Sequence, residues 1–338
     1  MALYRGSSRE LAASLGIVLL LLLVVHQLSY IDYRTLVSPI SQSIELIQAC
    51  PRPSRPEHAA PLHDARPAAG RNMPNIVHQI WKTADAHTYS MAASHDSWKA
   101  RLEPLNYTVR LWTDDDILGL IRAEYAWLLP TYESYPQNIQ RADVARLVVV
   151  HAQGGIYVDL DVYLESAEGL SCLQRLGLEA IFAPMSGAMG ISNHFFMAER
   201  ASPLLLWTLR EAERRGASTS RRIILPYLQV FWSTGPMMVT AAAREYARSR
   251  DTTRPGLGVL DNEFGGTVVR HEAGRSWQGS DGRLFNYLGD HAHIERPWLV
   301  FPILAVVLAL VCVVARRCAS RWSAVRLRKG ASLSRWRR

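Results

Sequence analysis

A glycine pair followed by a short apolar run and two acidic residues constrains the fold of this chain more than any other stretch. Residues 154–161 are Gly-Gly-Ile-Tyr-Val-Asp-Leu-Asp. Glycines let the backbone turn where a side chain would clash, and the β-branched and aromatic run after them is typical of a buried strand. This strand would end in Asp159 and Asp161. Paired carboxylates on a rigid element suit a hard divalent cation that carries a phosphorylated ligand.

A second Asp-x-Asp pattern lies at Asp114–Asp116, so the pattern by itself has little specificity. We expect about one chance occurrence in a chain of this composition. No strand-like run precedes these three acids, and acidic residues before an apolar periodic segment are typical of a helix start. We therefore predict a structural role for Asp114–Asp116 and a functional role for the pair that follows the glycines.

Strand-like and helix-like segments alternate through the middle of the chain. The patterns predict strands at 75–81, 107–112, 155–158 and 180–184, and helices at 96–105, 114–125 and 137–151. This alternation indicates an α/β sandwich with a largely parallel sheet. The chain has no Gly-x-Gly-x-x-Gly loop and no Gly-Lys-Ser/Thr phosphate loop, so neither a nicotinamide-binding fold nor a P-loop enzyme is supported.

Two uncharged apolar runs flank this middle part, at Leu11–Ile31 and Pro297–Ala315. A helix of 21 residues spans about 31 Å, close to the thickness of a hydrocarbon core. Each run has its basic flank on the side nearer the chain end, which predicts cytosolic termini and a lumenal segment 32–296. A cleaved signal peptide is the alternative for the first run, and a buried core helix for the second.

These features predict six parts of the chain. They are a cytosolic N-terminus at 1–10, a transmembrane helix at 11–31, a juxtamembrane stem at 32–71 that is Pro-rich after residue 50, a lumenal globular domain at 72–296, a transmembrane helix at 297–315 and a basic cytosolic tail at 316–338. The tail holds nine of the Lys and Arg residues and no acid, so it accounts for the net charge of +8. The rest of the chain is nearly neutral, which argues against binding to nucleic acid.

The cysteines and a glycosylation sequon give only weak support for a lumenal placement of the middle part of the chain. Cys50 and Cys172 could pair in an oxidising lumen, but spacing alone leaves the pairing open. Asn106-Tyr107-Thr108 is a sequon and is compatible with a lumenal placement.

Three further segments accompany the Asp pair. Trp81 ends the first predicted strand, where its ring could stack on a base or pack in the core. Asp143 and Arg146 lie three residues apart on the helix before the glycines and so share a face. Ser276-Trp277 lies in a late Gly-rich loop, after His271 and before Asp281.

In this order the segments resemble the Asp-x-Asp glycosyltransferases that include the yeast-type initiating α-1,6-mannosyltransferases, glycosyltransferase family 32. Residues 74–81 (Pro-Asn-Ile-Val-His-Gln-Ile-Trp) look like the opening motif of that family. Arg141-x-Asp143-x-x-Arg146 with Gly154–Asp161 looks like its core motif. The resemblance covers roughly residues 72–290. The two apolar runs are similar to one branch, the catalytic subunits of fungal mannosyl inositol phosphoceramide synthase.

The resemblance implies a GT-A-type, Rossmann-like α/β/α fold and transfer of mannose from GDP-mannose with retention of configuration. It implies a Golgi membrane protein that acts on inositol phosphoceramide and leaves open whether a regulatory membrane subunit takes part. Asp159 and Asp161 would hold Mn²⁺ or Mg²⁺. The residues expected to bind the donor are Trp81, Arg141, Asp143, Arg146, Gly155, Tyr157, Ser276 and Trp277, and those expected to be catalytic are Asp143, Arg146, Asp159 and Asp161.

Two positions depart from the family pattern. Ser202-Pro203-Leu204 stands where the family often has His-Pro-Phe, and Gln278 follows Ser276-Trp277 where a His is expected. Both lie away from the predicted metal pair, so they bear on the acceptor. Asn193–Phe196 would line the acceptor cleft or, for the two Phe, pack in the core. A glycoprotein or glycan acceptor is the alternative function, and a non-catalytic lumenal binding module is a further one.

Overall fold

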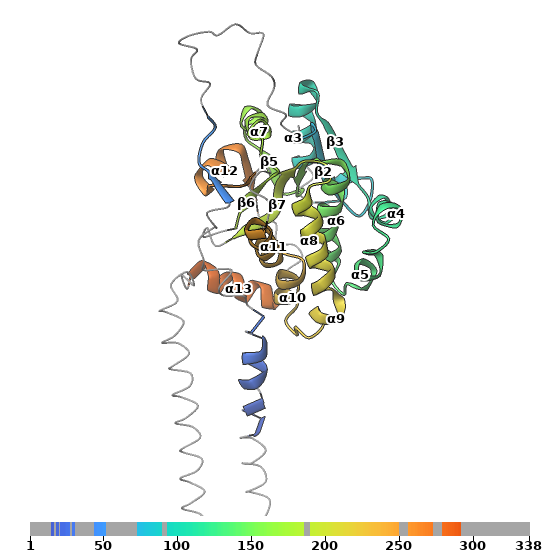
Figure 1. Ribbon diagram of the computed structural model, residues 1–338, viewed down its shortest axis with the longest axis vertical. Helices are drawn as coiled ribbons and strands as arrows, with labels where there is room; N and C mark the ends of the chain where they lie inside the picture. The colour runs from blue at the N-terminus through green and yellow to red at the C-terminus, as the bar shows by residue number, and fades with distance from the viewer. Residues whose placement is uncertain are drawn as a thin grey trace, which may run out of the picture. The chain divides into compact units, whose positions relative to one another are not determined.

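A computed structural model describes residues 15–16, 18–19, 21–27, 29–30, 44–51, 73–89, 93–185, 190–249, 256–272 and 279–291 (Figure 1). The chain divides into two compact units, residues 31–283 and residues 1–30 with 284–338. The sheet and the candidate site both belong to the unit 31–283.

A seven-stranded sheet with the order β1-β8-β6-β7-β4-β2-β3 forms the centre of this unit. The β1–β8, β8–β6, β4–β2 and β2–β3 pairs are parallel, whereas β7 is antiparallel to both β6 and β4. The prediction of a largely parallel sheet is confirmed. The strands are β1 Ile44–Ile47, β2 Ile76–Ile80, β3 Thr108–Trp112, β4 Gly155–Val158, β6 Ala180–Pro184, β7 Ile191–Ala198 and β8 Leu257–Leu260. A small separate sheet pairs β5 Val162–Leu164 with β9 Val269–His271.

Helices cover both faces of the sheet, and Figure 1 shows α6, α8 and α11 together on one of them. Side chains of α6, α8 and α11 share one buried cluster with Tyr157 and Phe196 of the sheet. Side chains of α3 and α7 share a second cluster with Ile156 and Phe195 from the opposite face. The helices are α3 Ala93–Leu102, α4 Asp114–Glu124, α5 Leu129–Ser134, α6 Asn138–Gln153, α7 Ala167–Gln174, α8 Pro203–Arg215, α9 Ala217–Ser220, α10 Pro226–Ser233, α11 Pro236–Ser249, α12 Asn262–Val268 and α13 Ser280–His291, with 3-10 turns at Ala86–Thr88 and Glu103–Leu105.

The two clusters explain why β4 is apolar throughout. Neighbouring residues of a strand point to opposite faces, and here both faces are covered by helices, so all four residues of β4 are buried. Phe195 and Phe196 of β7 likewise point to opposite clusters and are fully buried. Core packing is therefore their role.

The glycines before β4 allow a backbone approach that no side chain permits. Gly154 ends α6 and has a φ of 69°, and Gly155 has a φ of 103°. A Cβ atom at Gly155 would lie 2.4 Å from the carbonyl oxygen of Ile76 in β2. The chain can therefore turn from α6 directly into the central strand only with glycine at this position.

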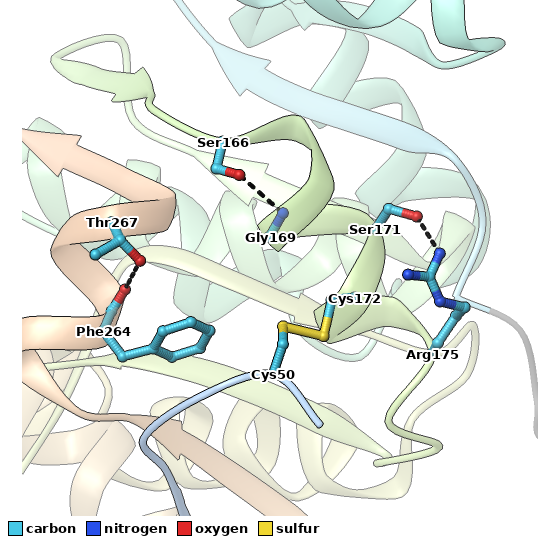
Figure 2. Close-up of a disulfide and its surroundings, with 8 residues drawn as sticks. All are labelled: Cys50, Ser166, Gly169, Ser171, Cys172, Arg175, Phe264 and Thr267. Atoms are coloured by element: carbon cyan, nitrogen blue, oxygen red, sulfur yellow. Dashed lines mark hydrogen bonds between the residues drawn. A yellow bond between two sulfur atoms is a disulfide. The ribbon is translucent and has the colours of Figure 1, made fainter. Parts of the chain in front are cut away.

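Part of the predicted stem belongs to the sheet, so the expected domain start near residue 72 is wrong. Ile44–Ile47 pairs in parallel with β8, and Ile44 and Ile47 enter the two opposite core clusters. Figure 2 shows that Cys50, just after β1, forms a disulfide with Cys172 of α7 across 122 residues of sequence. A four-residue strand is too short for its alternation to stand out, and its partner lies more than 200 residues away.

Asp114–Asp116 begin α4, as predicted. Thr113 is the N-cap, and it forms a capping box with Asp116. The hydroxyl of Thr113 accepts the Asp116 N–H at 3.2 Å, and the carboxylate of Asp116 accepts the Thr113 N–H at 3.0 Å. Two backbone donors at the helix start are thereby satisfied, and the structural role predicted for this acidic run is confirmed.

Within the described ranges, no helix is both long and apolar enough to cross a membrane. The first predicted span, 11–31, is described only in part, and residues 21–27 of it are helical. The second predicted span, 297–315, and the basic tail lie outside the described residues. Asn106 of the sequon is exposed and follows the 3-10 turn at Glu103–Leu105 with a φ of 61°.

Candidate active site

The candidate site lies where β2 and β4 end and β7 begins. The parallel register pairs Val77 with Ile156, so Trp81 after β2 and Asp159 after β4 leave the sheet at the same edge. β7 runs the other way and places its first residues, including His194, at this edge. The backbone N–H of Asp159 donates to the carbonyl oxygen of His194 at 2.9 Å. Ligands of open α/β sheets bind at the carboxyl ends of the parallel strands.

Both carboxylate oxygens of Asp159 are held by protein groups. The hydroxyl of Tyr157 donates to Oδ1 at 2.7 Å. The guanidinium of Arg146 donates from Nη1 to Oδ2 at 3.2 Å. These contacts fix the direction of the first carboxylate of the pair, although about a quarter of its side chain (26%) remains exposed.

Behind Asp159, a buried polar network joins α6, β7 and the end of α10. Arg146 and Asp143 of α6 form an ion pair at 3.4 Å, and each side chain is only 5% exposed. Asp143 also accepts hydrogen bonds from the Asn193 amide at 3.0 Å and the Thr234 hydroxyl at 2.9 Å. Arg146 donates a further bond to the carbonyl oxygen of Asn193 at 3.1 Å. Asp143 and Arg146 therefore support Asp159 from the protein interior.

The charges in this network depend on one another. Burial raises the pKa of the Asp143 and Asp159 carboxyls, and the Arg146 cation opposes that rise in both. Burial also works against the charge of Arg146, but the carboxylate of Asp159 and its neighbours outweigh it and raise the pKa of the guanidinium. The cation stays protonated and holds two buried carboxyls near the edge of the site.

Asp161 has different neighbours from Asp159. Its Oδ1 lies 3.5 Å from Nε2 of His271 in β9. The ring of His271 stacks on the ring of His194 with centroids 4.1 Å apart and planes 13° apart. Burial, followed by the charge of His271, lowers the pKa of His194 to about 3. Asp161 thus faces a pair of imidazoles, whereas Asp159 faces a guanidinium.

The donor set at this edge fits a divalent metal by its chemistry. Carboxylate oxygens suit Mg²⁺ and Mn²⁺, and an imidazole nitrogen suits Mn²⁺ and later transition metals. Among the residues that the structure describes, no group of three or more His, Cys, Asp or Glu is already arranged to hold an ion. Asp159 is engaged by Tyr157 and Arg146, and Asp161 lies beside His271.

Trp81 lies at the same edge in an aromatic and polar setting. Its ring is partly buried and lies against Tyr89, with centroids 4.7 Å apart. Its indole N–H donates to the hydroxyl of Thr88 at 2.5 Å. A partly buried indole can stack on a flat base, so the position predicted for Trp81 is compatible with nucleotide binding.

Other predicted donor residues differ in where the structure places them. Tyr157 adjoins the site through its hydrogen bond to Asp159, whereas Gly155 begins β4 at the other end of the strand. Arg141 instead bonds to the carbonyl oxygen of Tyr135 and to the side chain of Asn138 at the start of α6, which gives it a role in that turn. Ser276 and Trp277, with Gln278, lie outside the described residues.

Ser202, where the family pattern has a His, is explained by helix capping. It is the N-cap of α8, and its hydroxyl donates to the buried carboxylate of Glu179 at 2.8 Å. This position is fully buried.

Sequence reasoning did not predict the roles of Thr234, Asn193 and His271. Thr234 lies 91 residues from Asp143 in the chain, and Asn193 lies 50 residues from it. No local pattern marks such contacts. The polar run Ser192-Asn193-His194 at the start of an otherwise apolar strand was the available signal.

Fold and site together define an α/β protein with two carboxylates at the carboxyl edge of a mainly parallel sheet. A family model described as "Glycosyltransferase sugar-binding region containing DXD motif" matches residues 84–169, which include Asp143, Arg146, Asp159 and Asp161. This comparison confirms the resemblance predicted from the motifs. The chain is a glycosyltransferase, and residues 84–169 are similar to the DXD region of such enzymes.

Curated relatives agree with this class. Inositol phosphoceramide mannosyltransferase 1 of Schizosaccharomyces pombe is 24% identical over 257 residues, 75% of this chain and 78% of the relative. Inositol phosphoceramide mannosyltransferase 3 of the same yeast is 29% identical over 248 residues, 71% of this chain and 64% of the relative. Mannosyl phosphorylinositol ceramide synthase SUR1 of Saccharomyces cerevisiae is 27% identical over 240 residues, 68% of this chain and 58% of the relative.

Proposed function

We propose that this chain transfers mannose from GDP-mannose to inositol phosphoceramide, with the help of Mn²⁺ or Mg²⁺ and with retention of configuration. The observation that carries the proposal is the placement of Asp159 and Asp161 at the carboxyl edge of the sheet, with Arg146 behind Asp159. The names of three relatives that match most of the chain supply the sugar and the lipid. A GT-A-type fold is part of the proposal.

In the proposed reaction, Asp161 would bind the metal directly, and Asp159 would add a second carboxylate beside it. A bound divalent cation neutralises negative charge that develops on the departing nucleotide diphosphate. Arg146 opposes the rise in the pKa of Asp159 that burial causes and fixes its carboxylate, so the site is organised before the donor arrives. Trp81 would offer its ring to the guanine. Ser276 and Trp277 stay predicted contacts to the diphosphate.

The mechanism assigns no nucleophile and no general base. Asp143 is enclosed by Arg146, Asn193 and Thr234 and keeps its two oxygens on protein donors. We propose that it acts by positioning Arg146, and that direct contact of either side chain with the donor sugar needs a movement of this network.

We propose a lumenal catalytic domain in the Golgi membrane, anchored at both ends, with cytosolic termini. The disulfide between Cys50 and Cys172 supports an oxidising compartment, because cytosolic thiols are kept reduced. Two anchors would hold the catalytic face close to a lipid acceptor. A glycoprotein or glycan acceptor needs one anchor only, so the second apolar run favours the lipid.

Asp161→Asn tests the function in membranes that contain the full-length chain. Supplied with Mn²⁺, labelled GDP-mannose and inositol phosphoceramide, the wild type should form the mannosylated lipid, and the variant should lose at least about 100-fold of that rate, since a metal ligand is lost. Asp115→Asn is the matched control, because Asp115 belongs to the other Asp-x-Asp run at the start of α4 and is exposed.

Other sugar nucleotides and a mannan acceptor complete the assay. Transfer to the glycan and not to the lipid would replace the proposed acceptor, and transfer from another sugar nucleotide would replace the donor. Near-normal transfer by Asp161→Asn would remove the metal role, and no transfer by the wild type to any acceptor would favour a binding module.

A further inference from the structure

The fold presents the one sequon of the chain, Asn106-Tyr107-Thr108, at the protein surface. Asn106 and Thr108 are exposed, whereas Tyr107 between them is buried. In an Asn-x-Thr acceptor sequence, the amide of the first residue receives the sugar and the hydroxyl of the third is required for recognition. Both groups that this modification needs are therefore on the outside of the folded chain.

Main-chain hydrogen bonds hold the turn that contains the sequon. The N–H of Asn106 donates to the carbonyl oxygen of Glu103 at 3.1 Å, and the N–H of Tyr107 donates to that of Leu102 at 3.2 Å. The N–H of Thr108 donates to the carbonyl oxygen of Asn75 at 2.9 Å. The turn thus keeps its shape through the backbone, and a substituent on the Asn106 side chain leaves these bonds intact.

Asn106 lies at the edge of the sheet opposite to the candidate active site. β3 begins just after it and runs parallel to β2, with Thr108 beside Ile76 and Trp112 beside Ile80. The candidate site follows the carboxyl ends of these strands. Five residues of strand separate the two edges by roughly 16 Å. A large group on Asn106 would therefore leave the catalytic edge open.

A groove beside the sequon leaves room for such a group. Its volume is about 890 Å³, within the range of natural ligand pockets. Leu105 and Tyr107, the two neighbours of Asn106, line it together with Ser171 and Arg175 of α7, which Figure 2 shows next to each other. Leu105 is 52% exposed. The groove combines apolar surface with hydroxyl and guanidinium groups, the kinds of contact that a sugar ring makes.

The position also suits a hydrophilic group because β3 is the last strand in the sheet order. An edge strand presents backbone groups that can pair with another chain, and native proteins protect such edges. A bulky sugar at the start of β3 would shield this edge.

We propose that Asn106 carries an N-linked oligosaccharide. The inference rests on the lumenal placement proposed above, and on neither the sugar donor nor the acceptor of the enzyme. The disulfide between Cys50 and Cys172 supports the same compartment independently of the sequon.

The modification is a group transfer from a lipid-diphosphate-linked oligosaccharide, catalysed by an oligosaccharyltransferase of the host. The amide nitrogen of Asn106 forms a bond to C1 of the first sugar and loses one proton to solvent. The bond between C1 and the diphosphate oxygen breaks, and the lipid diphosphate leaves with the electron pair. The Thr108 hydroxyl is recognised and stays unmodified.

A purely structural role of Asn106 is the competing explanation. Its φ is 61°, in the left-handed region that asparagine adopts more readily than most residues. This explanation gives the Thr108 side chain no part, whereas glycosylation requires its hydroxyl. Thr108→Val keeps the branched shape of the side chain in β3 and removes the hydroxyl, and Thr108→Ser keeps the hydroxyl.

The experiment uses the full-length chain expressed in yeast and recovered in intact microsomes. Treatment with peptide:N-glycosidase F should increase the electrophoretic mobility of the wild type, and release in H₂¹⁸O should leave ¹⁸O on residue 106, located by peptide mass spectrometry. Asn106→Gln and Thr108→Val should migrate like the deglycosylated wild type and show no shift. Thr108→Ser is the matched control and should keep the shift.

Protease protection of the middle domain in the same microsomes separates the two proposals. If the domain is protected and the wild type shows neither the shift nor ¹⁸O at residue 106, the glycan is overturned and the lumenal placement stands. If the domain is digested and the shift is absent, both are overturned. A shift that persists in Asn106→Gln would place the sugar on another residue and would also overturn the inference.

Discussion

Removal of the buried Arg146 cation should destabilise the folded protein far more than removal of an exposed arginine. In Arg146→Met, the apolar side chain keeps most of the volume but leaves Asp143 and Asp159 without their shared cation. Breaking a buried ion pair from one side costs about 3–5 kcal/mol, because the remaining charge stays buried.

The contacts place the expected loss near the lower end of that range. Asp143 keeps hydrogen bonds from Asn193 and Thr234, which still satisfy its two oxygens. The Asp159 side chain is 26% exposed, so water can solvate part of its charge. Two carboxylates nevertheless remain close together with no cation between them, and we expect a loss of about 3 kcal/mol in the free energy of unfolding.

Urea unfolding of the full-length chain, followed by tryptophan fluorescence at pH 7, measures this loss. The matched control is Arg214→Met. Arg214 lies closer to its carboxylate, 2.6 Å from Glu211, but its side chain is 66% exposed. An exposed pair contributes little, so this variant should lose less than about 1 kcal/mol. A loss below about 1 kcal/mol for Arg146→Met as well would refute the reasoning, because the free energy lost on removing an arginine would then not depend on its burial.

The pH dependence gives a second check. Burial raises the pKa of Asp143 and Asp159, and the loss of Arg146 removes the largest effect that opposes that rise in each. A carboxyl with a raised pKa in the folded state contributes most at low pH, and its contribution is lost as the pH rises through the folded value. The difference between Arg146→Met and the wild type should therefore be larger at pH 7 than at pH 5. In the double variant Asp143→Asn/Arg146→Met, part of the loss should be recovered.

Two further predictions concern His78 and Gly155. Burial lowers the pKa of His78 to about 4, so between pH 6.5 and 5 the unfolded state takes up a proton that the folded state does not. The wild type should therefore lose up to about 2 kcal/mol in the free energy of unfolding as the pH falls across that range. In His78→Gln, the free energy of unfolding should depend less on pH over the same range. An equal slope in both proteins would contradict the assignment. Gly155→Ala should cost at least about 2 kcal/mol in thermal unfolding, because its φ is 103° and the new Cβ would meet the Ile76 carbonyl. Gly119→Ala, in the middle of α4 where nothing lies within 4 Å of the new Cβ, should instead raise stability by about 0.5–1 kcal/mol. If Gly155→Ala and Gly119→Ala changed stability in the same direction, the positive φ and the Ile76 contact would not explain the cost at Gly155.

Local patterns predicted the middle of the sheet well, for a physical reason. β2, β3, β4 and β6 are short runs with clear boundaries, and most side chains on them are buried or half-buried. The start of α4 was also predictable, because capping depends on residues three positions apart. These features depend on contacts within one or two neighbouring elements.

Features that depend on distant partners were not predictable in the same way. β1 joins the sheet only because β8, at 257–260, offers a parallel edge. His271 reaches the site only because β9 pairs with β5. A histidine in a three-residue strand has no local signal, and the Pro-rich composition after residue 51 favoured a stem for the whole of 32–71.

The Asp pair itself shows how far a motif can be interpreted. In the sequence, Asp159 and Asp161 look equivalent, since each is an acid at the end of one strand. In the fold, Asp159 is tied to Tyr157 and Arg146, whereas Asp161 faces His271. A carboxylate whose charge is already matched by a buried guanidinium has less to gain from a metal than one that faces an imidazole. The distinction follows from residues 13 and 110 positions away from each carboxylate, so the fold, and not the spacing of the motif, gives the two acids different neighbours.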